Sequence, residues 1–258
     1  MKTLLIAKRQ RLLALTVLSL GLVPIIILGQ HIDLFSHVSD ANGLLFSLLT
    51  DSAGSKGFII TLIAFSLLAL SKTITRAAVV KQMPILVLLL LLSFVGKSAL
   101  KLGTEVPRPY TEVISTHQLI DSPGAFYQLS RLQQNEVIKR LDGEVSQWRL
   151  QHWLGETDYS FPSGHTLFAS LCVAFFGGIF LNQKRYLALT LTLTWAIAVA
   201  YSRLWLGMHH PADLYGSLAF ICLVVLLLPH SLPLPEYIEK TLLDKGIIAS
   251  DENSKRQD

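Results

Sequence analysis

Six long stretches of the sequence contain no Asp, Glu, Lys or Arg, and they restrict the folds open to this chain. A helix needs about 20 apolar residues to cross the hydrocarbon core of a bilayer, so such stretches are candidate membrane spans. They hold 21, 15, 15, 18, 17 and 22 residues. In chain order they are Leu12–Ile32, Gly57–Ser71, Gln82–Gly96, Thr166–Gln183, Tyr186–Ser202 and Leu214–Pro235.

The second and third stretches are too short to span as straight helices. Lysines flank both of them: Lys56 and Lys72, then Lys81 and Lys97. Long lysine stems can reach the headgroups, and local thinning or a longer helix with charged ends would cover the remaining distance. We therefore expect an all-α protein, a bundle of six transmembrane helices.

The first stretch has a second interpretation, because four basic residues precede it, as in a signal peptide. No small-residue cleavage site follows, and the sequence stays apolar through Ile25–Leu28. We therefore expect an uncleaved first helix.

Charges in the connections predict the orientation of the bundle. The N-terminal residues and the connections around 72–81 and 184–185 carry nine basic residues and no acidic one. The 97–165 segment on the opposite side carries seven basic and eight acidic residues. The positive-inside rule places the first side in the cytoplasm. Both termini are then cytoplasmic, and the 97–165 segment faces outward.

Composition agrees with a membrane protein and excludes several other classes. The chain is 51% hydrophobic and 16% charged, against about 25% charged residues in soluble domains. A disordered chain and a nucleic-acid-binding arm are excluded, so no nucleic-acid partner is expected. The two cysteines, Cys172 and Cys222, lie in apolar runs and are expected to be free thiols.

Smaller segments complete the expected organisation, which is one membrane domain over residues 1–235 and a polar cytoplasmic tail over 236–258. The segment Leu119–Leu154 has apolar residues at helical spacing and predicts one or two amphipathic helices. These would form an extracytoplasmic cap over about residues 103–160. The short apolar segment Ala41–Thr50 predicts a helix at the membrane interface.

Three polar clusters lie at the outward ends of the predicted spans. The first runs from Lys101 to Pro109, the second from Phe161 to His165, and the third from Ser202 to Asp213. The topology brings all three to one face at one depth. Ionisable groups at membrane depth are costly and therefore indicate function.

Each cluster suits the recognition of a phosphate group. Lys101, Arg108 and Arg203 supply positive charge and N–H donors that match phosphate oxygens. Ser163 and Gly164 have the composition of a helix start, where free backbone N–H groups bind anions. Ser163 is equally well interpreted as a helix cap. Lys97, one turn before Lys101, would contact the headgroup or anchor the helix at the interface.

A histidine in each of two clusters predicts the chemistry. His209 and Asp213 are four residues apart and would share a helical face. The carboxylate of Asp213 would fix the tautomer of His209 and leave its other ring nitrogen free as a nucleophile. His165 would protonate the departing oxygen and then activate water. Asp213 could also cap a helix. With three cations present, we expect no metal and no cofactor.

These residues resemble a known family. The patterns K-x6-R-P (Lys101 to Pro109), P-S-G-H (Pro162 to His165) and S-R-x5-H-x3-D (Ser202 to Asp213) match the three-part signature of the type 2 phosphatidic acid phosphatase (PAP2) superfamily. The resemblance covers about residues 57 to 228. It implies a haloperoxidase-like helical core and a metal-independent enzyme with a periplasmic site. The implied substrates are lipids: phosphatidylglycerophosphate, phosphatidic acid and undecaprenyl pyrophosphate.

Other functions remain open at this stage. A lipid phosphotransferase would use the same phosphohistidine with an acceptor hydroxyl in place of water. A transporter, channel or inactive lipid-binding relative would place polar residues in mid-span or lose a signature residue, and neither is seen. A soluble haloperoxidase is disfavoured by the apolar spans.

Overall fold

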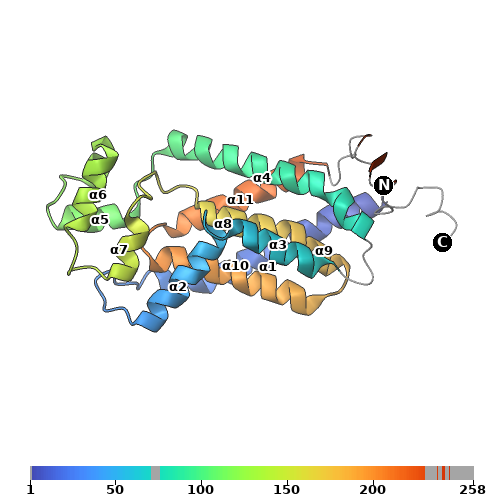
Figure 1. The fold of residues 1–258 in the computed structure, drawn as a ribbon, viewed down its shortest axis with the longest axis horizontal. Helices are drawn as coiled ribbons and strands as arrows, with labels where there is room; N and C mark the ends of the chain where they lie inside the picture. The colour runs from blue at the N-terminus through green and yellow to red at the C-terminus, as the bar shows by residue number, and fades with distance from the viewer. Residues whose placement is uncertain (1, 71–75, 230–236, 238–239, 242–243, 245–258) are drawn as a thin grey trace.

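The computed structural model describes residues 2–70 and 76–229, together with residues 237, 240, 241 and 244. The predicted tail over 236–258 thus lies almost entirely outside the described residues. Within them the regular structure is helical, which confirms the all-α prediction (Figure 1). The elements are α1 (Lys2–Gly29), α2 (Asp40–Ala53), α3 (Phe58–Ala69), α4 (Arg76–Thr104), α5 (Pro109–Thr116), η1 (Pro123–Gln128), α6 (Arg131–Lys139), α7 (Gln147–Trp153), α8 (Gly164–Cys172), η2 (Val173–Gly177), α9 (Gly178–Asn182), α10 (Tyr186–Trp205) and α11 (Pro211–Leu227).

Four described segments are long and apolar enough to cross a membrane. They are Lys8–Gly29, Gln82–Thr116, Gly164–Asn182 and Tyr186–Trp205. The pair α2 and α3 meets the same test together and would make a fifth span. Helix α11 has 17 residues and is shorter than these candidates. The count of six spans stays a prediction.

The two shortest predicted spans correspond to two different arrangements of helices. The third, Gln82–Gly96, lies inside α4, whose 29 residues continue past Lys97 and Lys101. At about 1.5 Å per residue, that helix is long enough to cross a bilayer. The second, Gly57–Ser71, contains α3, which has only 12 residues and follows α2 after a bend of 76°. The interfacial segment predicted at 41–50 forms part of α2.

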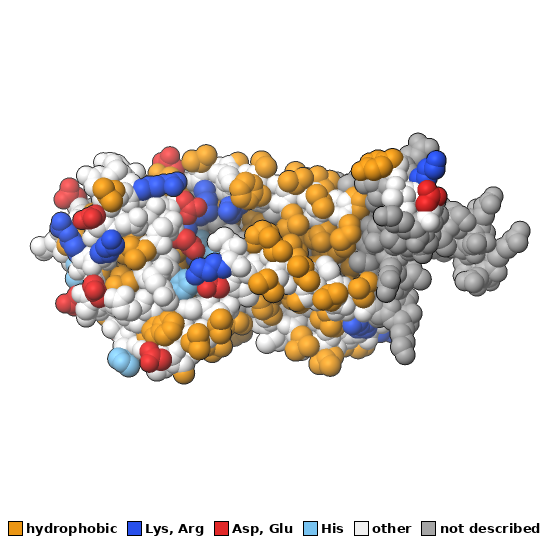
Figure 2. Space-filling view, in the orientation of Figure 1, with side chains coloured by type: hydrophobic (Ala, Val, Ile, Leu, Met, Phe, Trp, Pro, Cys, Tyr) orange, Lys and Arg blue, Asp and Glu red, His pale blue; other side chains and the backbone are white. Residues whose placement is uncertain are grey.

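The core of the bundle lies around α8, η2 and α9. Every residue from 166 to 180 is buried, and this segment packs against α1, α10 and α11. The outer surfaces of the bundle are apolar. They expose large side chains that include Leu20, Ile60, Phe94, Leu187 and Leu227. Figure 2 shows hydrophobic side chains over the middle of the molecule and charged side chains gathered over α5 to α7. A lipid-facing belt with one polar end has this distribution.

Helices α5, α6 and α7 form what we call the end segment (residues 109–154). Its own hydrophobic cluster surrounds Trp153, which stacks on Tyr110 with ring centroids 5.1 Å apart. The indole Nε1 of Trp153 donates to the carbonyl of Leu206 at 2.6 Å, so the cluster is fixed to the end of α10. Helices α6 and α7 are the two helices that the 119–154 pattern predicts. Their place outside a membrane stays a prediction.

Arg149 of α7 attaches the end segment to the bundle. Its side chain is buried, although it carries a charge. Its guanidinium donates to the carbonyls of Leu34 at 2.7 Å, Ser36 at 3.3 Å and Trp205 at 3.2 Å. It also lies over the Trp205 ring. One side chain therefore satisfies three carbonyls from two other parts of the chain.

Replacing Arg149 with Ala should destabilise the protein, because it leaves three part-buried carbonyls without this donor. A buried carbonyl without a donor costs about 1–3 kcal/mol. We expect the midpoint of thermal unfolding in detergent to fall by about 5 °C or more. The control is Arg140→Ala, which removes an exposed arginine of the same segment. Equal midpoints for the two variants would contradict the proposed attachment.

Candidate active site

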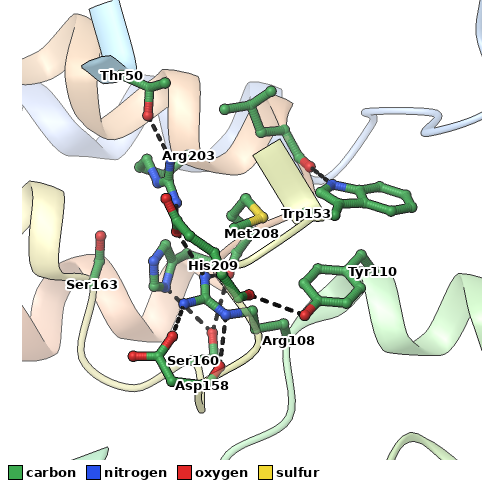
Figure 3. A network of polar contacts seen from close by, with 12 residues as sticks. Thr50, Arg108, Tyr110, Trp153, Asp158, Ser160, Ser163, Arg203, Met208 and His209 are labelled. Carbon is green, nitrogen blue, oxygen red and sulfur yellow. Dashed lines mark hydrogen bonds and ion pairs between the residues drawn. The ribbon is translucent and has the colours of Figure 1, made fainter. Parts of the chain in front are cut away.

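The first cluster lies between the last turn of α4 and the start of α5. Helix α4 ends at Thr104, soon after Lys101, and Arg108 precedes Pro109, the first residue of α5. Pro109 therefore begins a helix, where its missing N–H costs nothing. Arg108 is 2% exposed, and its Nη1 donates to the carbonyl of Met208 at 3.2 Å. This contact brings the first and third clusters together (Figure 3).

The second cluster begins α8 as the sequence predicts. Ser163 is the N-cap, and its hydroxyl accepts from the backbone N–H of Thr166 at 3.3 Å. The backbone N–H of Ser163 donates to the carbonyl of Asp213 at 3.3 Å. Ser217 donates to the carbonyl of Ser163 at 2.8 Å. These bonds dock the start of α8 onto the first turn of α11 and favour the capping interpretation of Ser163.

The third cluster joins His209 to Asp213 across the start of α11. Their Nδ1 and Oδ2 atoms are 3.1 Å apart, and both side chains are buried. The predicted contact is confirmed, but its geometry differs from a shared helical face, since His209 precedes the helix. Pro211 is the first helical residue, and Asp213 reaches back to accept also from the backbone N–H of His210 at 2.8 Å. With Nδ1 engaged, Nε2 of His209 is free to react.

A cavity of about 370 Å³ lies where the clusters meet. It is lined by six of the predicted site residues, Lys97, Lys101, Arg108, Gly164, His165 and His209, and by Ser55, Arg131, Gly155, Glu156, Thr157 and Asp158. Ser163, Arg203 and Asp213 are absent from this lining and contact residues that form it. No three His, Cys, Asp or Glu side chains of the described part of the chain are grouped to hold a metal ion.

Two glycines leave room for cavity side chains. A Cβ at Gly164 would lie 3.0 Å from Cδ of Lys97, and a Cβ at Gly54 would lie 2.7 Å from Nε2 of His165. Gly54 stands at the bend between α2 and α3. The bend therefore passes directly beside His165, and a side chain at position 54 would crowd its Nε2.

Two carboxylates in the loop before α8, which the sequence analysis does not single out, pair with the three cations. Glu156 accepts from Nη2 of Arg203 at 2.8 Å and lies 3.7 Å from Arg108. Asp158 pairs with Arg108 and lies 3.3 Å from Nζ of Lys101. The backbone carbonyl of Asp158 also accepts from Nε of Arg108 at 2.7 Å. In this state the chain's own carboxylates occupy the cation surfaces that an incoming anion would use.

Surrounding charges set the ionisation of the groups in the connecting loops. Burial alone would raise the pKa of Glu156, but attraction to Arg203, His165 and Arg108 lowers it to about 2. Arg108 and Lys101 likewise outweigh burial and lower the pKa of Asp158. Burial, followed by repulsion from Arg108, Arg203 and Lys101, holds the pKa of His209 well below its usual value. His209 is therefore neutral at neutral pH, as a nucleophile must be.

The sequence analysis also missed two residues that hydrogen-bond to site residues without lining the cavity. Thr50 of α2 accepts from Nη1 of Arg203 (Figure 3). Ser160 donates to Oδ2 of Asp213. The sequence could have indicated that carboxylates lie near the site, because three cations that converge at membrane depth require opposite charge. No sequence signal indicated Thr50 or Ser160, since neither type of residue is unusual in its sequence context.

Comparison with known proteins now identifies the family. The sequence model of the PAP2 superfamily matches residues 82–234. The chain therefore belongs to the PAP2 superfamily.

Individual relatives agree with this assignment. The chain is 33% identical over 218 residues to phosphatidylglycerophosphatase B of Haemophilus influenzae, covering 78% of this chain and 87% of that protein. It is 37% identical over 123 residues to phosphatidylglycerophosphatase B of Escherichia coli K12. That match covers 46% of this chain and 47% of the relative, so the chain spans about half the length of this relative.

The ionisation of His209 can be observed directly. Its lowered pKa means that the imidazole should stay neutral as the pH falls through 6.5 and gain a proton only at more acidic pH. Side-chain ¹⁵N chemical shifts of histidine-labelled protein in detergent would show this, with the His209 signal assigned by its loss in His209→Asn. A signal that titrates at or above pH 6.5 would contradict the result.

Asp158 should compete with anions for Arg108 and Lys101. Its side chain is 56% exposed, whereas that of Arg108 is 3% exposed, so Asp158 is the partner that can move away. We expect Asp158→Asn to bind orthovanadate about two- to fivefold more tightly by calorimetry, the range for a partly exposed ion pair. Asp142→Asn, the same charge change at an exposed site, is the control. Weaker binding by Asp158→Asn would mean that Asp158 instead holds the cations in place.

Proposed function

We propose that the chain is a membrane lipid phosphate phosphatase that acts through a phosphohistidine at His209. The observation that carries the proposal is the 3.1 Å contact between Nδ1 of His209 and Asp213 beside a cavity lined by Lys101, Arg108 and His165. A neutral imidazole held by a carboxylate and surrounded by cations suits attack on phosphorus. The names of the relatives support a lipid phosphate as substrate.

The reaction has two steps. Nε2 of His209 forms a bond to phosphorus while the bond from phosphorus to the lipid oxygen breaks, and protonated His165 gives that oxygen its proton and becomes neutral. Water then attacks the phosphohistidine, His165 takes the proton of the water, and the N–P bond breaks to release phosphate. Lys101, Arg108, Arg203 and the backbone N–H groups near Ser163 and Gly164 stabilise the equatorial oxygens in each step. Binding requires Asp158 to leave the cation surface.

The substrates we propose are phosphatidylglycerophosphate, phosphatidic acid and undecaprenyl pyrophosphate. Each offers a terminal phosphate on an apolar anchor. The exposed apolar belt of the bundle suits a lipid that stays in the bilayer while its headgroup enters the cavity. Lys97, which lines the cavity, would contact the headgroup.

We further propose six spans in a bacterial inner membrane, with both termini cytoplasmic and the site on the periplasmic face. Helices α2 and α3 would form one span and α11 another. In Figure 1 the end segment lies opposite the beginning of α1 and the connection between α9 and α10. The basic residues Lys8, Arg9, Arg11, Lys184 and Arg185 belong to those two regions, which supports a cytoplasmic position for them. The end segment would then form the periplasmic cap of a single domain over residues 1–235.

Phosphate release with a single lipid substrate in detergent tests this function. His209→Ala should abolish release, and Asp213→Asn should slow it about 100-fold or more, because the tautomer of the nucleophile is lost. His31→Ala, which removes an exposed histidine outside the site, should keep full activity. EDTA should have no effect, since the cations neutralise the phosphate.

Each alternative gives a different result in the same assay. Normal release by His209→Ala would refute the nucleophile, and loss of activity with EDTA would indicate a metal. Phosphate that appears only on an added acceptor alcohol would indicate a phosphotransferase. No release from any of the three lipids by the unmodified chain would refute the phosphatase.

A further inference from the structure

Ser160 is the one non-histidine side chain that contacts the carboxylate of Asp213 among the described residues. It lies in the loop between the end segment and α8 and is fully buried. Its backbone N–H donates to the carbonyl of Val106 at 2.8 Å, which fixes the residue against the connection before Arg108. Because the backbone of this buried residue is fixed, the hydrogen bond of its hydroxyl keeps a constant direction.

The hydroxyl of Ser160 has one proton and three acceptors nearby. Oδ2 of Asp213 is the nearest, Nδ1 of His209 lies at 3.3 Å, and the carbonyl of Met208 lies at 3.4 Å. Donation to Asp213 leaves a lone pair of Ser160 facing the Nδ1–H of His209. Ser160 therefore contacts both members of the histidine–carboxylate pair.

Asp213 depends on such support, because its contacts fall on a single oxygen. Oδ2 accepts from Ser160, from His209 at 3.1 Å and from the backbone of His210 at 2.8 Å. Oδ1 is buried and has no hydrogen-bond partner among the described residues. Partial rotation of the carboxylate about its Cβ–Cγ bond would move Oδ2 away from Nδ1 of His209, and the hydrogen bond from Ser160 opposes that rotation.

We propose that Ser160 is a positioning residue, whose hydroxyl holds Oδ2 of Asp213 against Nδ1 of His209 so that Nε2 of His209 stays directed at the phosphorus. This role rests on the proposed function. In this role Ser160 acts on the step in which the N–P bond forms. It leaves the phosphate-binding surface unchanged, because Ser160 does not line the cavity.

Steady-state kinetics and anion binding together test the proposal. Ser160→Ala should lower kcat about 10-fold or more, the size expected for an outer residue that orients a reacting histidine. KM and the dissociation constant for orthovanadate should stay unchanged. The control is Ser170→Ala, which removes a buried hydroxyl of α8 that has no hydrogen-bond partner among the described residues and should leave kcat unchanged. Ser160→Thr keeps a hydroxyl and should keep most of kcat.

A spectroscopic readout separates positioning from a general structural effect. In the unmodified chain the ¹⁵N shifts of His209 should report the Nδ1–H tautomer alone, and in Ser160→Ala they should report a mixture of the two tautomers. An unchanged kcat in Ser160→Ala, or a kcat loss in folded Ser160→Thr equal to that in Ser160→Ala, would overturn the proposal. Weaker vanadate binding would also overturn it, because Ser160 would then shape the binding surface. The tautomer measurement does not require catalysis. An inactive unmodified chain would therefore refute the proposed function, and the tautomer of His209 would still test the positioning role of Ser160.

Discussion

Three cations buried side by side must be neutralised, and that constraint organises this end of the molecule. Lys101, Arg108 and Arg203 come from the ends of three different segments. The first two line one cavity, and Arg203 pairs with Glu156, which also lines it. Their mutual repulsion in a poorly solvated place would be severe without opposite charge. Glu156 and Asp158 supply it from the loop before α8. The same cations then become a binding surface for any anion that can replace the more exposed carboxylate.

The bundle and the end segment have separate roles in this arrangement. The bundle fixes the His209–Asp213 pair at the start of α11 and the helix start at Ser163. Arg108 stands directly before the end segment, at the N-terminus of α5, and Arg149 of α7 anchors the segment to the bundle. An apolar exterior and a polar site at one end are the two properties that a lipid phosphatase needs. The proposed function rests on their combination, because either property alone is common.

Sequence patterns predicted the parts of the site that depend on helix ends. Ser163 caps α8 and Pro211 begins α11, since local backbone chemistry decides both. The clusters converge because each stands at the end of a helix. The pairing of α2 with α3 was missed, because two charged residues, Asp51 and Lys56, separate the two apolar segments in the sequence. The positions of Glu156 and Asp158 were missed because a loop has no periodicity from which to trace its path.

The loop over residues 155–160 serves three groups of the site at once. Its backbone carbonyls accept from Arg108 and Lys101, its carboxylates face the cations, and Ser160 touches Asp213. Replacing one residue therefore alters the geometry in which the others act, and combined substitutions should depart from the sum of the single ones. The partners of this loop lie outside it, so a change within it can be compensated at Lys101, Arg108 or Asp213.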